Sequence, residues 1–216
     1  MSKAGAVIAV YGAKGGVGTT TVACNLALAL RRHTHQQDVA LLDGEPHFGG
    51  VFTTMGLPAA EGWTRHESGV LVAAPDALGI DLLVDEARRR ADWVIVDTPS
   101  LLTRASVRVL QRSQRVLLVV TPEETAARHA RAFLDLCQER DLASDVRVVV
   151  NRSGSASGLT VTRLDETFGP RLVAHLDSDG PLVVASINTG RPFVHALPAH
   201  RLSQQLDSLA HTLAAA

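Results

Sequence analysis

The residues with the clearest chemical potential lie in a glycine-rich segment near the start of the chain. Gly12-Ala13-Lys14-Gly15-Gly16-Val17-Gly18-Thr19-Thr20 follows a short apolar run and precedes a helical pattern. Glycines let a loop bend tightly so that backbone N–H groups converge on an anion, and the N-terminus of the following helix adds its positive dipole. The order strand, glycine loop, helix therefore predicts a phosphate-binding site.

This loop departs from the strict phosphate-loop pattern G-x-x-x-x-G-K-[ST] at two positions. Ala13 stands where the first glycine belongs, and Thr19 stands where the lysine belongs. Thr20 keeps the hydroxyl position that would coordinate Mg²⁺. Lys14 is one of only two lysines among 21 basic residues, the other being Lys3. Because the chain otherwise uses arginine, we expect a compact ammonium to be needed at position 14.

Polar side chains also end several apolar runs. Asp43 and Asp97 each follow a predicted strand, and Asn151-Arg152 follows a third. Ligands of open parallel sheets bind outside the carboxyl ends of the strands, so both aspartates are expected beside the phosphates. The alternative for Asp97 is a helix cap, and the alternative for Asn151 is a turn residue.

These residues need a scaffold, and short apolar runs alternating with helical patterns predict one. We expect an α/β fold with a mostly parallel central sheet flanked by helices, in a single domain over residues 1–216. Thr53–Ser68 carries no assignable pattern and could be a switch or partner loop. The predicted strands are Ala6–Tyr11, Val39–Leu42, Val70–Ala73, Trp93–Val96, Val116–Val120, Val146–Val150 and Arg171–His175; the predicted helices are Thr20–Arg32, Leu78–Arg90, Arg104–Gln111, Glu123–Arg140, Leu159–Phe168, Pro181–Thr189 and Ala199–Leu213.

Composition narrows the classes of protein. A hydrophobic share of 46% is typical of a globular domain, and a net charge of −1 does not imply a strongly basic surface that coats DNA. Cys24 and Cys137 are interpreted as buried thiols of a reducing compartment. No segment resembles a signal peptide or reaches the ~20 apolar residues of a membrane span. We therefore expect a cytoplasmic protein without direct membrane insertion.

The glycine loop resembles a known family. Lys14-Gly15-Gly16-Val17-Gly18-x-Thr20 is similar to the deviant Walker A motif of the MinD/ParA superfamily, and Thr19 at the lysine position resembles the CpaE/TadZ branch. The resemblance runs from Ala6 to about Val194. It implies ATP and Mg²⁺ as cofactors and a homodimer with nucleotide at the interface, where Lys14 reaches the partner's nucleotide. The nucleotide contacts it implies are Gly15, Gly16, Val17, Gly18, Thr19, Thr20 and Thr21.

The same resemblance assigns roles to later residues. Trp-Val-Ile-Val-Asp97-Thr-Pro resembles the Walker B site, and Asp43-Gly44-Glu45-Pro46 followed by Phe48-Gly49-Gly50 resembles switch I. Glu45 takes the position of the acid that places the attacking water. Asn151 and Arg152 take the position that contacts adenine, and Leu176–Pro192 resembles a late segment that often lies near the base. The implied metal site comprises Thr20, Asp43 and Asp97.

Function follows as an expectation. Loss of the second lysine to Thr19 predicts ATP binding with weak or absent hydrolysis. The expected role is that of CpaE/TadZ-like proteins, which place a pilus or secretion machine, with partners recruiting the protein to a pole or to the inner membrane face. The alternatives are a ParA-like partition ATPase that binds DNA through a basic stripe (Arg104, Arg108, Arg112, Arg115), and a MinD-like septum-site regulator. Iron–sulfur reductases of the superfamily are disfavoured because Thr98–Val120 lacks cysteine.

Overall fold

The computed structural model describes residues 4–34, 36–45, 49–60, 62–75, 79–156 and 158–215. The strands are β1 (Ala6–Gly12), β2 (Val39–Asp43), β3 (Thr64–Arg65), β4 (Leu71–Ala73), β5 (Trp93–Thr98), β6 (Arg115–Val120), β7 (Val146–Ser153) and β8 (Leu172–Asp177). The helices are α1 (Thr19–His33), α2 (Val51–Thr54), α3 (Ile80–Arg90), α4 (Arg104–Arg112), α5 (Glu124–Arg140), α6 (Val161–Phe168), α7 (Gly180–Thr189), α8 (Phe193–Ala196) and α9 (Arg201–Ala215), with a 3₁₀ turn, η1, at Gly169–Arg171.

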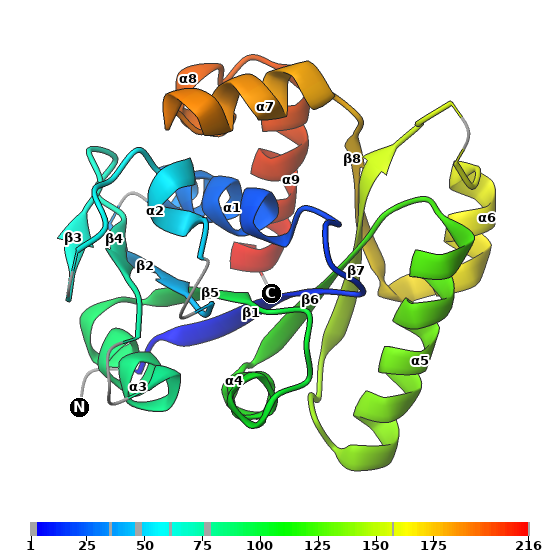
Figure 1. The fold of residues 1–216 in the computed structure, drawn as a ribbon, viewed down its shortest axis with the longest axis horizontal. Helices are drawn as coiled ribbons and strands as arrows, with labels where there is room; N and C mark the ends of the chain where they lie inside the picture. The colour runs from blue at the N-terminus through cyan, green and yellow to red at the C-terminus, as the bar shows by residue number, and fades with distance from the viewer. Residues whose placement is uncertain are drawn as a thin grey trace.

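These strands form one sheet in the order β3-β4-β2-β5-β1-β6-β7-β8, with helices on both of its faces (Figure 1). All neighbouring pairs are parallel except β3 and β4, which are antiparallel. The predicted α/β fold with a mostly parallel sheet is confirmed. The antiparallel edge strand β3 was not predicted, because two residues carry no readable periodicity.

The register of the central strands brings the polar strand ends together. β1 lies between β5 and β6, and its apolar run is buried on both faces, as is usual in parallel sheets. Val10 pairs with Asp97 across β1 and β5, and Asp43 pairs with Asp97 across β2 and β5. Both aspartates therefore lie at the carboxyl end of the sheet, where the glycine loop leaves β1.

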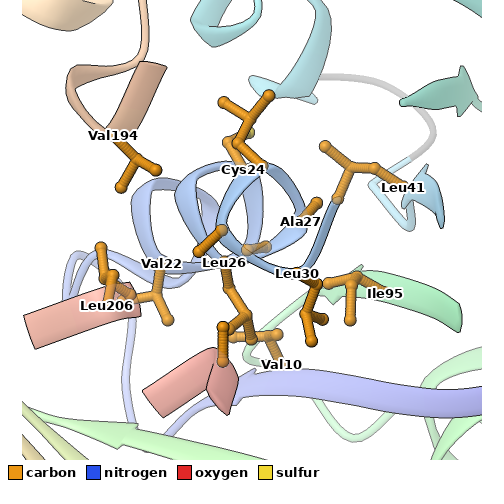
Figure 2. Packing of buried hydrophobic residues seen from close by; sticks show 14 of the residues in the cluster. Val10, Val22, Cys24, Leu26, Ala27, Leu30, Leu41, Ile95, Val194 and Leu206 are labelled. Atoms are coloured by element: carbon orange, nitrogen blue, oxygen red, sulfur yellow. The ribbon is translucent and has the colours of Figure 1, made fainter. Parts of the chain in front are cut away.

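The core has two layers, one on each face of the sheet. One layer packs α1, α2, α8 and α9 against the sheet, and the other packs α3 to α6 against the opposite face. Helix α1 is buried from Val22 to Leu30 because α9 and α8 cover the sides that the sheet leaves open. Figure 2 shows Leu206 of α9 beside Val22, and the backbone N–H of Val194 in α8 donates to Asn25 Oδ1 over 3.0 Å. Because α1 is packed on all sides, it holds the C-terminal end of the glycine loop in place.

Several local expectations were refined. Within Thr53–Ser68 the structure places the end of α2 and the whole of β3, and β7 continues through Asn151 and Arg152 to Ser153. Leu78, the predicted start of a helix, lies outside the described residues. Within the described residues this helix, α3, begins at Ile80. Among the described residues, no helix combines the length and apolarity needed to cross a bilayer.

Candidate functional site

A cavity of about 300 Å³ opens at the carboxyl end of the sheet, against the glycine loop. Three segments line it: the loop and first turn of α1, the segment between β2 and α2, and the segment between β5 and α4. The predicted residues that line it are Lys14, Gly15, Gly16, Gly18, Thr19, Thr20, Thr21, Glu45 and Asp97. The structure thus gathers residues that the sequence placed on three separate loops.

Two glycines of the loop have no room for a side chain. A Cβ on Gly12 would lie 2.6 Å from Thr19 Oγ1. Gly18 adopts φ +90°, a left-handed conformation that L side chains rarely take, and its Cβ would lie 2.4 Å from Asn151 Nδ2. The glycines therefore serve the tight path of the loop, as a phosphate cradle requires. Val17 does not line the cavity, because its side chain is fully buried in the core.

Thr20 and Asp97 meet at the floor of the cavity. Thr20 Oγ1 donates a hydrogen bond to Asp97 Oδ2 over 2.6 Å. Burial raises the pKa of Asp97 to about 7; the hydrogen bond from Thr20 lowers it, and the nearby charge of Asp43 raises it. A buried carboxylate beside a hydroxyl is costly in the charged form without a cation, so this pair is suited to a positive ion.

Asp43 lies behind this pair and does not line the cavity. Its carboxylate accepts hydrogen bonds from the backbone N–H of Glu45 over 3.1 Å and of Val51 over 3.2 Å. A Cβ on Gly49 would lie 2.1 Å from Asp43 Oδ2, so the segment passes directly over the carboxylate. Burial raises the pKa of Asp43 despite the two amide hydrogen bonds. In this conformation Asp43 holds the backbone that carries Glu45, and its role as a direct metal ligand stays a prediction.

Lys14 contacts Glu123, a residue that the sequence analysis did not identify. Its Nζ forms a hydrogen-bonded ion pair with Glu123, which directly precedes α5. The hydrogen bond from Lys14 holds the pKa of Glu123 below its ordinary value. Glu123 follows the end of β6, a neighbour of β1, so the strand-end reasoning applied to Asp43 and Asp97 would have found it.

A second cavity, of about 310 Å³, adjoins the first through Gly18 and Thr21. Asn151 and Arg152 line one side of it, and the segment from Asp177 to Val184 lines another. This position beyond the phosphate loop suits the base of a nucleotide. The later part of the predicted segment, Ala185–Pro192, does not line this cavity.

The pair Asn151 and Arg152 is tied to the glycine loop. Asn151 Nδ2 donates to the carbonyl of Val17 over 2.8 Å, and Arg152 Nη2 donates to the carbonyl of Gly16 over 3.2 Å. Arg152 has φ +57°, a conformation that costs a non-glycine residue roughly 1–2 kcal/mol. Such strain persists where the surroundings fix it, which is common at functional sites. Adenine contact by these two residues stays a prediction.

The donor set fits a magnesium nucleotide. Hydroxyl and carboxylate oxygens are the ligands that Mg²⁺ takes, and Thr20 with Asp97 would hold it. The glycine loop and Lys14 would hold phosphates. When bound, the ion neutralises phosphate charge. A structural cluster of three or more His, Cys, Asp or Glu residues able to hold a metal by itself is absent from the described ranges.

The chain is similar in sequence and in fold to known proteins. A family model named ParA, described as NUBPL iron-transfer P-loop NTPase, matches residues 3–67. The septum site-determining protein MinD of Thermotoga maritima is 24% identical over 97% of this chain and 88% of its own length. Maintenance of carboxysome distribution protein A of Gloeobacter kilaueensis is 29% identical over 90% of this chain and 78% of its own length. MinD of Pyrococcus horikoshii, solved with Mg-ADP, superposes with a TM-score of 0.84 at 17% identity and covers 96% of this chain and 95% of that one.

The chain has the fold of the MinD/ParA P-loop NTPases. The family model and the curated relatives also support its place in the MinD/ParA superfamily. The two cysteines of the chain, Cys24 and Cys137, are both buried and lie in separate layers of the core.

Three of the four arginines of the basic stripe form ion pairs with acids of the same chain. Arg108 and Arg112 pair with Asp81 of α3, and Arg115 pairs with Asp145 over 2.8 Å. Arg104 alone among the four forms no ion pair with a described residue. Arg108 and Arg112 stay partly exposed beside these acids, at 48% and 37%, so contact of the stripe with DNA stays a prediction.

Proposed function

We propose that the chain is an ATP-binding, dimerising positioning protein that is a weak ATPase at most. The observation that carries the proposal is the lysine arrangement of the loop: Lys14 lines the cavity, and Thr19 fills the place of the second lysine. A charge-assisted hydrogen bond to phosphate contributes roughly 1.5–3 kcal/mol. Its loss at Thr19 weakens binding by about ten- to a hundredfold and removes a charge from the transition state of phosphoryl transfer.

The proposed dimer uses Lys14 as its exchangeable contact. In the single chain Lys14 is paired with Glu123, and both side chains are partly exposed, at 32% and 49%. An ion pair in that setting contributes about 0–1 kcal/mol, so it is readily exchanged for a phosphate. We infer that Lys14 leaves Glu123 for the nucleotide of a second copy when both chains carry Mg-ATP.

Positioning is supported by the names of the relatives. "Septum site-determining" and "carboxysome distribution" each describe the placement of a cellular structure. We propose that the cargo here is a pilus or secretion machine of the CpaE/TadZ kind, and that its protein partners bring the chain to a pole or to the inner membrane face. A MinD-like regulator of the septum site is the second candidate, favoured by the MinD relative that aligns with 97% of the chain.

Two measurements test the nucleotide proposal. Isothermal titration and single-turnover hydrolysis compare the wild type with Thr19→Lys, and Thr19→Ser serves as the matched uncharged control. We expect Thr19→Lys to bind ATP more tightly and to hydrolyse it faster, while Thr19→Ser behaves as the wild type. Rapid hydrolysis of equal rate in all three proteins contradicts the weak-ATPase proposal.

Sedimentation velocity tests the dimer. Mg-ATP is expected to dimerise the wild type but not Lys14→Ala, and Lys3→Ala is the control because it removes the other lysine of the chain. A dimer that survives Lys14→Ala unchanged refutes the exchange of Lys14 between chains. Salt-sensitive DNA binding by the wild type at micromolar protein would instead favour a ParA-like partition function.

A further inference from the structure

An apolar groove lies beside the phosphate cavity, between the start of α3 and the start of α4. We call it the α3–α4 groove; its volume is about 250 Å³, and the residues that make it apolar are Ile80, Val96, Pro99, Leu101, Ala105 and Val109. This volume falls below the roughly 300–1,000 Å³ that encloses a drug-sized ligand, and it suits a side chain of leucine or methionine size.

The groove continues onto exposed apolar surface. Leu101 is 71% exposed and Leu102 is 42% exposed, although the end of β5 at Thr98, three residues before Leu101, is buried. Two adjacent exposed leucines at the rim of an apolar groove extend the surface that a partner can cover, and such surfaces mark interaction sites. A protein segment covers this area better than a small molecule does.

The exposure of Leu101 is built into the loop. The buried hydroxyl of Ser106 donates to the carbonyl of Leu101 over 2.5 Å and accepts from the N–H of Thr103 over 2.8 Å. On the other side, the hydroxyl of Tyr11 donates to the carbonyl of Ser100 over 2.8 Å. The loop is therefore held in the shape that presents Leu101 outward, which lowers the cost of ordering it on binding.

Arg104 lies on the chain between Thr103 and Ala105, which line the groove, although Arg104 itself does not line it. Arg104 is the first residue of α4, the first turn of the helix contains no acid, and Arg104 forms no ion pair within the described part of the chain. A cation at the positive end of a helix dipole is unfavourable unless an anion lies nearby. Glu45 lines both the groove and the phosphate cavity, so the acidic side chain marks the other end.

We propose that the α3–α4 groove docks a protein partner through an apolar side chain of leucine size with a neighbouring carboxylate. The apolar side chain enters over Ile80 and Val109, and the carboxylate pairs with Arg104 at the N-terminus of α4. Glu45, Thr98 and Pro99 line the phosphate cavity as well as the groove, so partner and nucleotide contact the same residues. Nucleotide binding in the cavity can therefore change the shape of the groove that the partner contacts.

Methyl NMR of the full chain tests the docking chemistry without nucleotide, so its outcome is independent of the ATP proposal. The probes are acetyl-Leu-Glu-Leu-amide, acetyl-Leu-Lys-Leu-amide and acetyl-Ser-Glu-Ser-amide. We expect the first peptide to shift the methyl signals of Ile80, Val96 and Val109 saturably at millimolar concentration. The lysine peptide should bind about two- to fivefold more weakly, and the serine peptide should leave these signals in place.

Charge reversal supplies the decisive variant. Arg104→Glu should invert the preference between the glutamate and lysine peptides, whereas Arg128→Glu, on the exposed face of α5, should leave it unchanged. Absence of methyl shifts with the first peptide overturns the proposal, as does an unchanged preference in Arg104→Glu. Self-association of the nucleotide-free wild type that Leu101→Ser abolishes in sedimentation equilibrium would also overturn it, because a second copy would then occupy the groove.

Discussion

Replacement of Asp97 by asparagine should stabilise the ligand-free protein at pH 8 and leave its stability nearly unchanged at pH 4. Burial raises the pKa of Asp97 from an ordinary value of 3.8 to about 7, with the charge of Asp43 adding to the rise. Below pH 3.8 the carboxyl is protonated in both the folded and the unfolded chain. As the pH rises towards 7 the unfolded chain releases this proton while the folded chain keeps it, so the free energy of unfolding falls.

The size of the effect follows from the same values. Each pH unit between the two pKa values is equivalent to 1.36 kcal/mol, so a rise from 3.8 to about 7 corresponds to roughly 4 kcal/mol of stability lost above pH 7. Relaxation of the buried site reduces this figure, and we expect a gain of about 2–4 kcal/mol in Asp97→Asn at pH 8. The amide oxygen can still accept the hydrogen bond from the Thr20 hydroxyl, so Thr20 keeps its partner.

Urea unfolding between pH 3 and pH 8, in the presence of EDTA, measures the effect as a difference between wild type and variant. Asp145→Asn is the control, because its effect on stability should have the opposite sign. Burial raises the pKa of Asp145, but the hydrogen bonds from Arg115 and Arg147 outweigh burial, so the pKa lies below its ordinary value. Its loss should therefore destabilise at pH 8, and the difference should shrink as the pH falls below 4. Parallel stability curves for wild type and Asp97→Asn across this range refute the reasoning.

Two further substitutions probe the segments around the cavity. Glu123→Gln releases Lys14 from its ion pair and should strengthen the Mg-ATP-dependent dimer by up to about fivefold in sedimentation equilibrium; a weaker dimer argues that Glu123 orients Lys14 for its task. Gly49→Ala places a Cβ 2.1 Å from the Asp43 carboxylate and should cost about 1–3 kcal/mol in thermal unfolding. Gly50→Ala, whose Cβ has its nearest contact at 3.4 Å, should cost clearly less, and equal losses contradict the close approach at Gly49.

The sequence predicted the elements whose signals are local. The buried apolar run of β1 and the apolar periodicity of α1 decide their structure within one window of the chain, and their predicted bounds agree with the structure to within one residue at each end. The four-residue helices α2 and α8 span one turn each, which is too short for a periodic pattern. Their positions depend on packing against α1, which no local window contains.

In the candidate site, too, some features were predictable from the sequence and others were not. Glycine spacing and strand-end acids predicted which segments line the cavity, because a parallel sheet aligns the ends of its strands. Strand-end reasoning could have placed Glu123 near the cavity, but not its pairing with Lys14; that pair and the bond from Asn151 to the carbonyl of Val17 join residues more than a hundred positions apart. Such contacts follow from the packed fold and leave no mark in residue type or spacing.

These internal partners determine what nucleotide binding must do. Thr20 is bonded to Asp97, Lys14 to Glu123 and Asn151 to the loop backbone, so these three side chains predicted to bind nucleotide or its metal already have partners in the free chain. Binding then gains only the difference between old and new contacts. With Thr19 in place of a lysine, the described loop offers phosphates no cation except Lys14, which is proposed to serve the second copy. The charge of Mg²⁺ must therefore supply most of the neutralisation, and because Asp97 has to lose its proton to bind the ion, nucleotide affinity should depend on Mg²⁺ more steeply at pH 8 than at pH 6.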